Sequence, residues 1–174
     1  KPQTTEFSIV DRAAQLRNQH DHVLFYSGQN DLRSGMAPRT LPNATLHSPY
    51  YVSTDDALNT LTVLAQDNNW GVLFKPHPNV RKPPPTQPED SSPNMITLDG
   101  ANIFECILES ELTVTILSAT AYLALIHQRP VVLLGNMLLT GKGCVYEPGT
   151  RDAAADTIAR ALQDGFTDEQ ERNF

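Results

Sequence analysis

Lys75 and His77 are the residues whose types and spacing most directly indicate chemistry in this sequence. They stand two positions apart in the run Lys75-Pro76-His77-Pro78, where two prolines stiffen the chain and lower the entropy lost on binding. An ammonium group and an imidazole N–H both donate hydrogen bonds to phosphate, and histidine also transfers protons near neutral pH. The run therefore predicts an anion site, with a histidine that merely ends a strand as an equally frequent alternative.

Ser118 and Thr120 provide hydroxyl groups where a buried strand gives way to a helix. The free N–H groups at a helix start favour anions, although a serine here is more often a plain helix cap. Glu109 offers a carboxylate that could hold ribose hydroxyls or could be a solvated loop charge. Gly135 ends another apolar run and would let the backbone approach a ligand, or serve a turn.

The other reactive residue types give no coherent metal or thiol site. Cys106 and Cys144 are the two cysteines, which form neither a disulfide framework nor a zinc ribbon and suit a reducing compartment. His20 and His22 have no evident third ligand, so we read them as surface residues. We expect no metal and no cofactor.

Apolar runs with the length of strands alternate with helical segments along the chain. The predicted strands are His22–Gly28, Gly71–Lys75, Met95–Leu98, Leu112–Leu117 and Val131–Gly135. The main predicted helices are Asp11–Gln19, one from Ser53 or Thr54 to about Asn68, Ile103–Leu108, Ala119–His127 and Arg151–Asp164. This alternation predicts an α/β fold, a Rossmann-like three-layer α/β/α domain with a mainly parallel sheet over residues 22–174, after a lead-in segment 1–21. Ligands of such sheets bind beyond the carboxyl ends of the strands.

Composition excludes several classes of protein. Thirteen basic and twenty acidic residues give a net charge of -7, which argues against a nucleic-acid partner. No apolar run approaches the roughly 20 residues of a membrane span, and neither GxGxxG nor a Walker A sequence is present.

A proline-rich stretch, Pro76–Pro93, is expected to be a surface loop. Because the chain does not begin with Met and ends in a polar segment, 168–174, we expect it to be a fragment.

Taken in chain order, these motifs resemble those of bacterial capsule polysaccharide biosynthesis proteins, a family that includes β-Kdo transferases. The matching stretches are Gly28-Gln29, His47-Ser48-Pro49-Tyr50, Lys75-Pro76-His77-Pro78-Asn79, Ser118 to Leu125, and Arg129-Pro130-Val131-Val132-Leu133-Leu134-Gly135. The resemblance covers about residues 22–174. It implies the C-terminal, donor-binding half of a GT-B glycosyltransferase, which would be inactive without its other half.

The resemblance also implies the substrates and the residues that hold them. The donor would be a CMP-activated sugar, CMP-Kdo, and the acceptor a polysaccharide or glycolipid. The resemblance implies that CMP is bound by Lys75, His77, Pro78, Ser118, Thr120 and Glu109. To these nucleotide-binding candidates we add Gly135, the glycine noted above. We expect a cytoplasmic location, with peripheral association with the inner face of the inner membrane or with the assembly machinery.

One position departs from the family pattern. Where an aspartate is expected four residues after Gln29, this chain has Arg33, so a catalytic carboxylate would have to be Asp31. Two alternatives therefore stay open. One is a GT-B enzyme that uses a UDP- or GDP-sugar, or an epimerase of that shape. The other is a non-catalytic, degenerate module in polysaccharide assembly or export.

Overall fold

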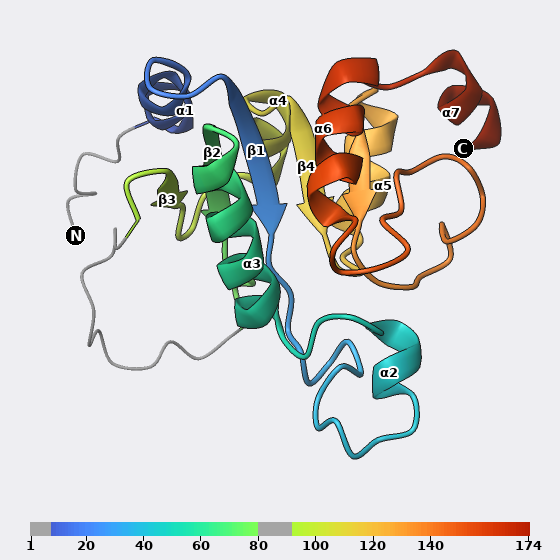
Figure 1. Ribbon diagram of the computed structural model, residues 1–174. Coiled ribbons are helices and arrows are strands. Elements are labelled where there is room, and N and C mark those ends of the chain that lie inside the picture. The colour runs from blue at the N-terminus through green and yellow to red at the C-terminus, as the bar shows by residue number, and fades with distance from the viewer. Residues whose placement is uncertain (1–7, 80–91) are drawn as a thin grey trace.

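A five-stranded parallel sheet forms the centre of the computed structural model, which describes residues 8–79 and 92–174 (Figure 1). Its strands are β1 (His22–Ser27), β2 (Trp70–Lys75), β3 (Met95–Thr97), β4 (Leu112–Thr115) and β5 (Val131–Leu133). They lie in the order β3-β2-β1-β4-β5, and every neighbouring pair is parallel. This confirms the predicted Rossmann-like α/β fold. The order reverses between β1 and β4, where such sheets open a crevice for ligands.

Helices cover both faces of the sheet and make the other two layers. The helices are α1 (Ile9–Arg17), α2 (Ala44–His47), α3 (Thr54–Asp67), α4 (Ile103–Leu108), α5 (Thr120–Ile126), α6 (Ala154–Asp164) and α7 (Asp168–Asn173). Of these, α2 lies outside the layers, in the segment between β1 and α3 (Figure 1). Residues of α1, α4 and α5 share one hydrophobic cluster, and those of α3 and α6 share the other. The three layers therefore match the architecture predicted from the alternation of strands and helices.

Residues of β1 alternate between these two clusters. Val23 and Phe25 pack on the side of α1, α4 and α5, whereas Leu24 and Tyr26 pack on the side of α3 and α6. All four side chains are fully buried. Burial on both faces explains why the strand is a continuous apolar run rather than an alternating one. Each such side chain contributes about 1.5–3 kcal/mol through removal from water.

Residues 28–53, between β1 and α3, form a lobe that extends beyond the carboxyl ends of the strands (Figure 1). Turns and bends make up most of these residues, together with the short helix α2. The buried Gln29 side chain accepts a hydrogen bond from the Leu117 N–H at 3.1 Å. Asn136 donates to the Leu46 carbonyl at 2.7 Å. These bonds fasten the lobe to the carboxyl edge of the sheet.

Some predicted boundaries shift. The helix predicted from Arg151 begins at Ala154, and the Arg151 side chain instead bonds the Asp56 carboxylate at 2.9 Å. The helix predicted over Ala119–His127 is the seven-residue α5. Residues 80–91 of the predicted proline-rich loop lie outside the described part of the chain. The predicted start of α3 is confirmed, because Ser53 caps it by accepting from the Asp56 N–H at 3.0 Å.

Candidate functional site

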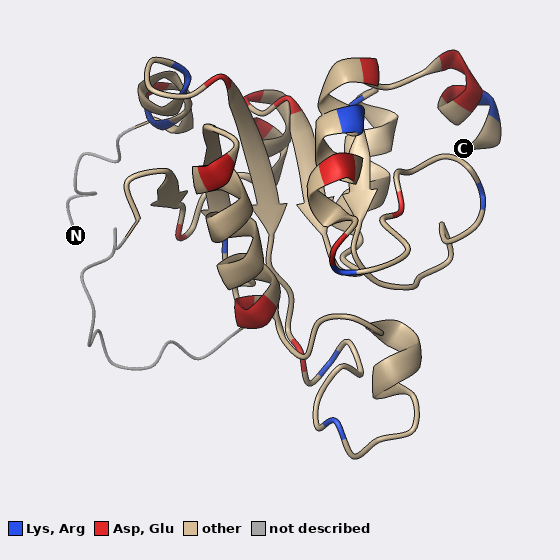
Figure 2. Cartoon of the chain, viewed as in Figure 1, with Lys and Arg blue, Asp and Glu red and all other residues tan. Residues whose placement is uncertain are grey.

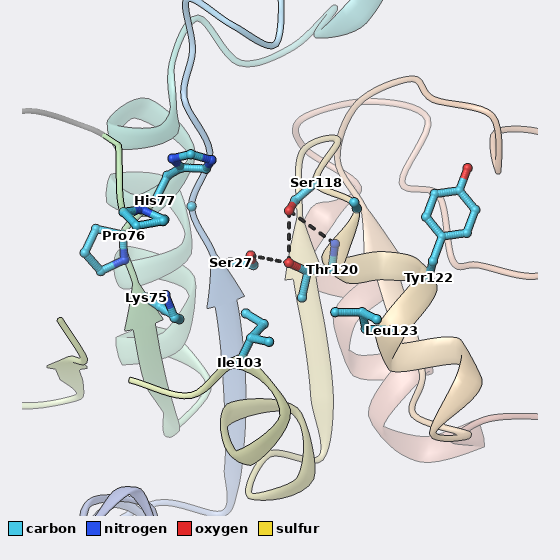
Figure 3. A pocket seen from close by; sticks show the side chains of 12 residues that line it. Ser27, Lys75, Pro76, His77, Ile103, Ser118, Thr120, Tyr122 and Leu123 are labelled. Carbon is cyan, nitrogen blue, oxygen red and sulfur yellow. Dashed lines mark hydrogen bonds between the residues drawn. The ribbon is translucent and has the colours of Figure 1, made fainter. Parts of the chain in front are cut away.

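A pocket of about 500 Å³ opens at the carboxyl ends of β1, β2 and β4, where the strand order reverses (Figure 3). It is lined by Ser27, Gly28, Lys75, Pro76, His77, Pro78, Ile103, Ser118, Ala119, Thr120, Tyr122 and Leu123. Five of the residues predicted from sequence to bind a nucleotide are therefore brought together: Lys75, His77, Pro78, Ser118 and Thr120. The β2 end supplies the cationic wall and the β4–α5 junction supplies the hydroxyl wall.

His77 is held in one orientation by its own loop. Its Nδ1 accepts a hydrogen bond from the Asn79 N–H at 3.1 Å. Because Nδ1 is occupied as an acceptor, the proton of the neutral ring lies on Nε2. The ring therefore keeps one N–H donor for a ligand. Together with the flanking prolines, this bond limits the motion that binding would have to suppress.

Lys75 is the last residue of β2 and lines the pocket with a partly buried side chain. Across residues 8–79 and 92–174 it forms no ion pair. Burial raises the pKa of the neighbouring Cys106 thiol to about 11, although the charge of Lys75 acts in the opposite direction. Cys106 is therefore a protonated core residue at neutral pH. Because no carboxylate of the described residues pairs with it, the Lys75 ammonium can pair with a bound anion.

The opposite wall is a network of hydroxyl groups (Figure 3). Thr120 Oγ1 lies 2.9 Å from Ser27 Oγ and 3.0 Å from Ser118 Oγ. Ser118 also accepts from the Thr120 N–H at 3.3 Å. It is not the helix cap weighed as the alternative reading, because the N-cap of α5 is Ala119, which makes no side-chain cap hydrogen bond. The Ser118 side chain lines the pocket instead. With seven residues in α5, the side chains matter more here than the helix dipole.

Glu109 and Gly135 are not brought to this pocket. Glu109 lies at the opposite edge of the sheet, where Arg17 donates to its carboxylate and its carbonyl, each at 2.7 Å. It cannot hold a ribose bound beside Lys75, which corrects that expectation. Gly135 lines a separate, smaller pocket of about 80 Å³. A Cβ there would lie 2.6 Å from the His47 carbonyl oxygen, so close packing against the lobe requires the glycine.

Asp31, the predicted catalytic carboxylate, follows β1 but does not line the pocket. Its carboxylate accepts from the Thr54 hydroxyl at 2.7 Å and from the Thr54 N–H at 3.0 Å. These bonds link the lobe to the first residue of α3. In this arrangement Asp31 acts as a structural acceptor, and Arg33 nearby has an exposed side chain.

Sequence reasoning missed the apolar part of the lining, which is Ile103, Tyr122 and Leu123. A signal for Ile103 was present, because a crossover helix in a parallel sheet begins at the carboxyl edge and Ile103 is the first residue of α4. Tyr122 and Leu123 occupy the first turn of α5, next to the hydroxyl wall. An apolar surface beside hydrogen-bond donors is typical of small-molecule sites.

Within 8–79 and 92–174, no three His, Cys, Asp or Glu side chains are grouped so as to hold a metal ion. In those ranges no helix has the length and apolar character needed to cross a bilayer.

Comparison with known proteins finds a likeness among solved structures. No family model and no curated protein matches the chain. Among solved structures, the chain is similar to Thermosulfurimonas dismutans KpsC, a beta Kdo 2,7 transferase, with a TM-score of 0.54 and 21% sequence identity. The match covers 82% of this chain and 47% of that one, so this chain spans about half its length. At this identity, the likeness establishes a fold shared with a region of a sugar transferase.

Proposed function

We propose that this chain is the donor-binding domain of a bacterial glycosyltransferase of capsule or O-antigen polysaccharide biosynthesis, with CMP-Kdo as its donor. One observation carries the proposal: Lys75, His77, Ser118 and Thr120 line a single pocket at the switch point of a Rossmann-like sheet. The fold shared with the KpsC structure, which is named as a Kdo transferase, supports the same reading.

The pocket residues suit the phosphate of a nucleoside monophosphate. Loss of CMP from a CMP-sugar leaves additional negative charge on that phosphate. The His77 N–H and the Lys75 ammonium stabilise that charge, and His77 can also donate a proton to the leaving group. Each charge-assisted hydrogen bond contributes about 1.5–3 kcal/mol. After the cost of association, two or three such bonds give roughly millimolar affinity, about -4 kcal/mol.

The remaining roles follow from this assignment. The apolar surface of Ile103 and Leu123 is where the nucleoside would pack. The acceptor, a polysaccharide or glycolipid, would approach from the other half of a longer protein at the cytoplasmic face of the inner membrane. Asp31 would act as a catalytic base only after release from Thr54, so we assign the proton transfer on the donor side to His77.

A non-catalytic binding module is the second candidate. It is favoured by Arg33 in place of the expected aspartate and by the engagement of Asp31 with Thr54. Such a module would keep nucleotide binding and lack transfer. The full-length protein, given CMP-Kdo and an acceptor extract, separates the two: sugar transfer supports the enzyme, and its absence supports the module.

A calorimetric titration with CMP, UMP, UDP and GDP tests the donor class. The proposal predicts selective, roughly millimolar binding of CMP and its loss in His77→Ala. Preference for UDP or GDP would instead support a different nucleotide-sugar enzyme. Unchanged CMP affinity in His77→Ala would contradict the assignment of the phosphate to this pocket.

A further inference from the structure

Three hydroxyl groups on one wall of the pocket form an unbranched chain. Ser27, at the end of β1, lies 2.9 Å from Thr120, and Thr120 lies 3.0 Å from Ser118. Ser27 and Thr120 are buried, at 4% and 7% exposure. Figure 3 shows all three groups side by side on the β1 and β4 side of the pocket, across from His77 and Pro76.

The number of protons in this chain is fixed by chemistry. Each hydroxyl has one proton to donate and two lone pairs that accept. Two hydrogen bonds join the three groups, so two protons are used and one is left over. The spare proton belongs to Ser27, Thr120 or Ser118, according to the direction in which the bonds run. Without a ligand, the geometry allows all three arrangements.

An anionic oxygen next to Ser118 would select one direction, because it accepts hydrogen bonds and cannot donate them. Ser118 already accepts from the Thr120 N–H. If it also accepts from the Thr120 hydroxyl, both of its lone pairs are filled and its proton must point outward. Thr120 then accepts from Ser27. The bonds run from Ser27 to Thr120 to Ser118 and then to the ligand.

We propose that Ser27 is a positioning residue for the phosphate, acting through Thr120 to direct the Ser118 proton toward the bound anion. This inference rests on the proposed nucleotide function and adds a residue that the sequence motifs did not assign. Hydrogen bonds in a chain polarise and strengthen one another. Ser27 therefore contributes to phosphate affinity without a contact to the phosphate.

The test is a double-mutant cycle on CMP affinity, measured by NMR titration. Ser27→Ala is expected to weaken binding about twofold to tenfold, the range for one neutral hydrogen bond. In the Ser118→Ala background, Ser27→Ala is expected to have no further effect, because the group it acts through is gone. A merely structural role would give the same loss in both backgrounds.

Ser110→Ala is the matched control. Ser110 is also a buried serine, 3% exposed, and donates one hydrogen bond to the Ile107 carbonyl at 3.2 Å, away from the pocket lining. It should lower the melting temperature about as much as Ser27→Ala and leave CMP affinity unchanged. Equal losses from Ser27→Ala in both backgrounds, or no loss in either, would overturn the inference while nucleotide binding stands. A wild-type chain that binds no nucleotide would overturn both proposals.

Discussion

Charged residues at the two edges of the sheet differ in whether they are paired. At the amino edge, Arg17 and Glu109 lie 2.7 Å apart and join α1 to the end of α4. At the carboxyl edge, Lys75 and His77 line a pocket and form no ion pair within residues 8–79 and 92–174. A paired charge has its counterion within the protein, whereas an unpaired cation that lines a pocket can pair with a negatively charged group of a ligand. The Arg17–Glu109 pair therefore stabilises the fold, whereas Lys75 and His77 are available to a ligand.

Position alone does not decide which charges are free. Acidic and basic residues are interspersed over the described helices and loops (Figure 2). Arg151 follows the sheet's last strand and precedes α6, yet its guanidinium bonds both oxygens of Asp56 at 2.9 and 3.2 Å. It also lies 5.1 Å from the centre of the Tyr51 ring. Arg151 is therefore a structural clamp between α3 and α6.

Lys75→Ala should weaken CMP binding strongly. Loss of one charge-assisted hydrogen bond, worth about 1.5–3 kcal/mol, predicts CMP affinity at least tenfold weaker. Thermal stability should change little, because Lys75 has no ion-pair partner among the described residues. Calorimetry and a thermal melt measure the two quantities. Unchanged affinity together with a lower melting temperature would reverse the comparison.

Gly135→Ala should destabilise the fold without removing a ligand contact. The added Cβ would lie 2.6 Å from the His47 carbonyl oxygen and 2.7 Å from Ile116 Cγ2, so the lobe must shift. Overpacking of this kind costs about 1–3 kcal/mol, measurable by urea denaturation. The glycine was expected from sequence to serve the nucleotide. A fully stable variant with weakened CMP binding would restore that reading.

Asp56→Asn should change how the free energy of unfolding depends on pH in the acid range. The pKa of Asp56 is lowered in the folded protein. Burial alone would raise this pKa, but the hydrogen bonds from Arg151 and the Val52 N–H, together with the charge of Arg151, outweigh that effect. Because this pKa is lower in the folded chain than in the unfolded chain, where it is about 4, the ionised carboxylate stabilises the fold at pH values above about 4. The contribution is lost as the pH falls through the pKa of the folded state. Because the pair is partly exposed, we expect about 1 kcal/mol or less at pH 7.

The difference between wild type and Asp56→Asn should therefore shrink as pH falls below about 4. Chemical denaturation at several pH values measures it. A difference that stays constant with pH would show that the carboxylate's charge is not what stabilises the contact.

Arg17→Ala should have the smallest effect. Its pair with Glu109 is exposed to solvent, and such pairs contribute about 0–1 kcal/mol. CMP affinity should stay at the wild-type value, since the pair lies at the edge away from the pocket. This variant is the control for Lys75→Ala, because each removes one long cationic side chain. Equal losses of affinity in both would show that net charge, rather than the pocket, governs binding.

The fold was largely predictable because a continuous apolar run of strand length is a local signal. The apolar run of β1, ending at Ser27 and Gly28, marks a strand buried on both faces, and five such runs predicted the five parallel strands found. The Lys75-Pro76-His77-Pro78 and Ser118-Thr120 motifs were found for a related reason. Each follows a strand directly, and the carboxyl ends of parallel strands meet at one edge.

Residues whose roles depend on long-range contacts were not predictable in this way. Glu109 stands between a predicted helix and a predicted strand, but only the structure shows that it pairs with Arg17 from α1. Asp31 and Thr54 are 23 positions apart, and no local pattern links them. Their bond depends on how the lobe folds back on α3, which neither periodicity nor capping chemistry encodes.

The most direct test of phosphate binding at the carboxyl edge is a titration of the ¹⁵N-labelled chain with CMP, followed by two-dimensional NMR. The account predicts that the largest shift changes fall on the amides of Ser27, Gly28, Lys75, His77 and Ser118 to Leu123, with Glu109 and Arg17 unaffected. Shift changes centred on the Arg17–Glu109 edge, or spread evenly over the domain, would contradict it.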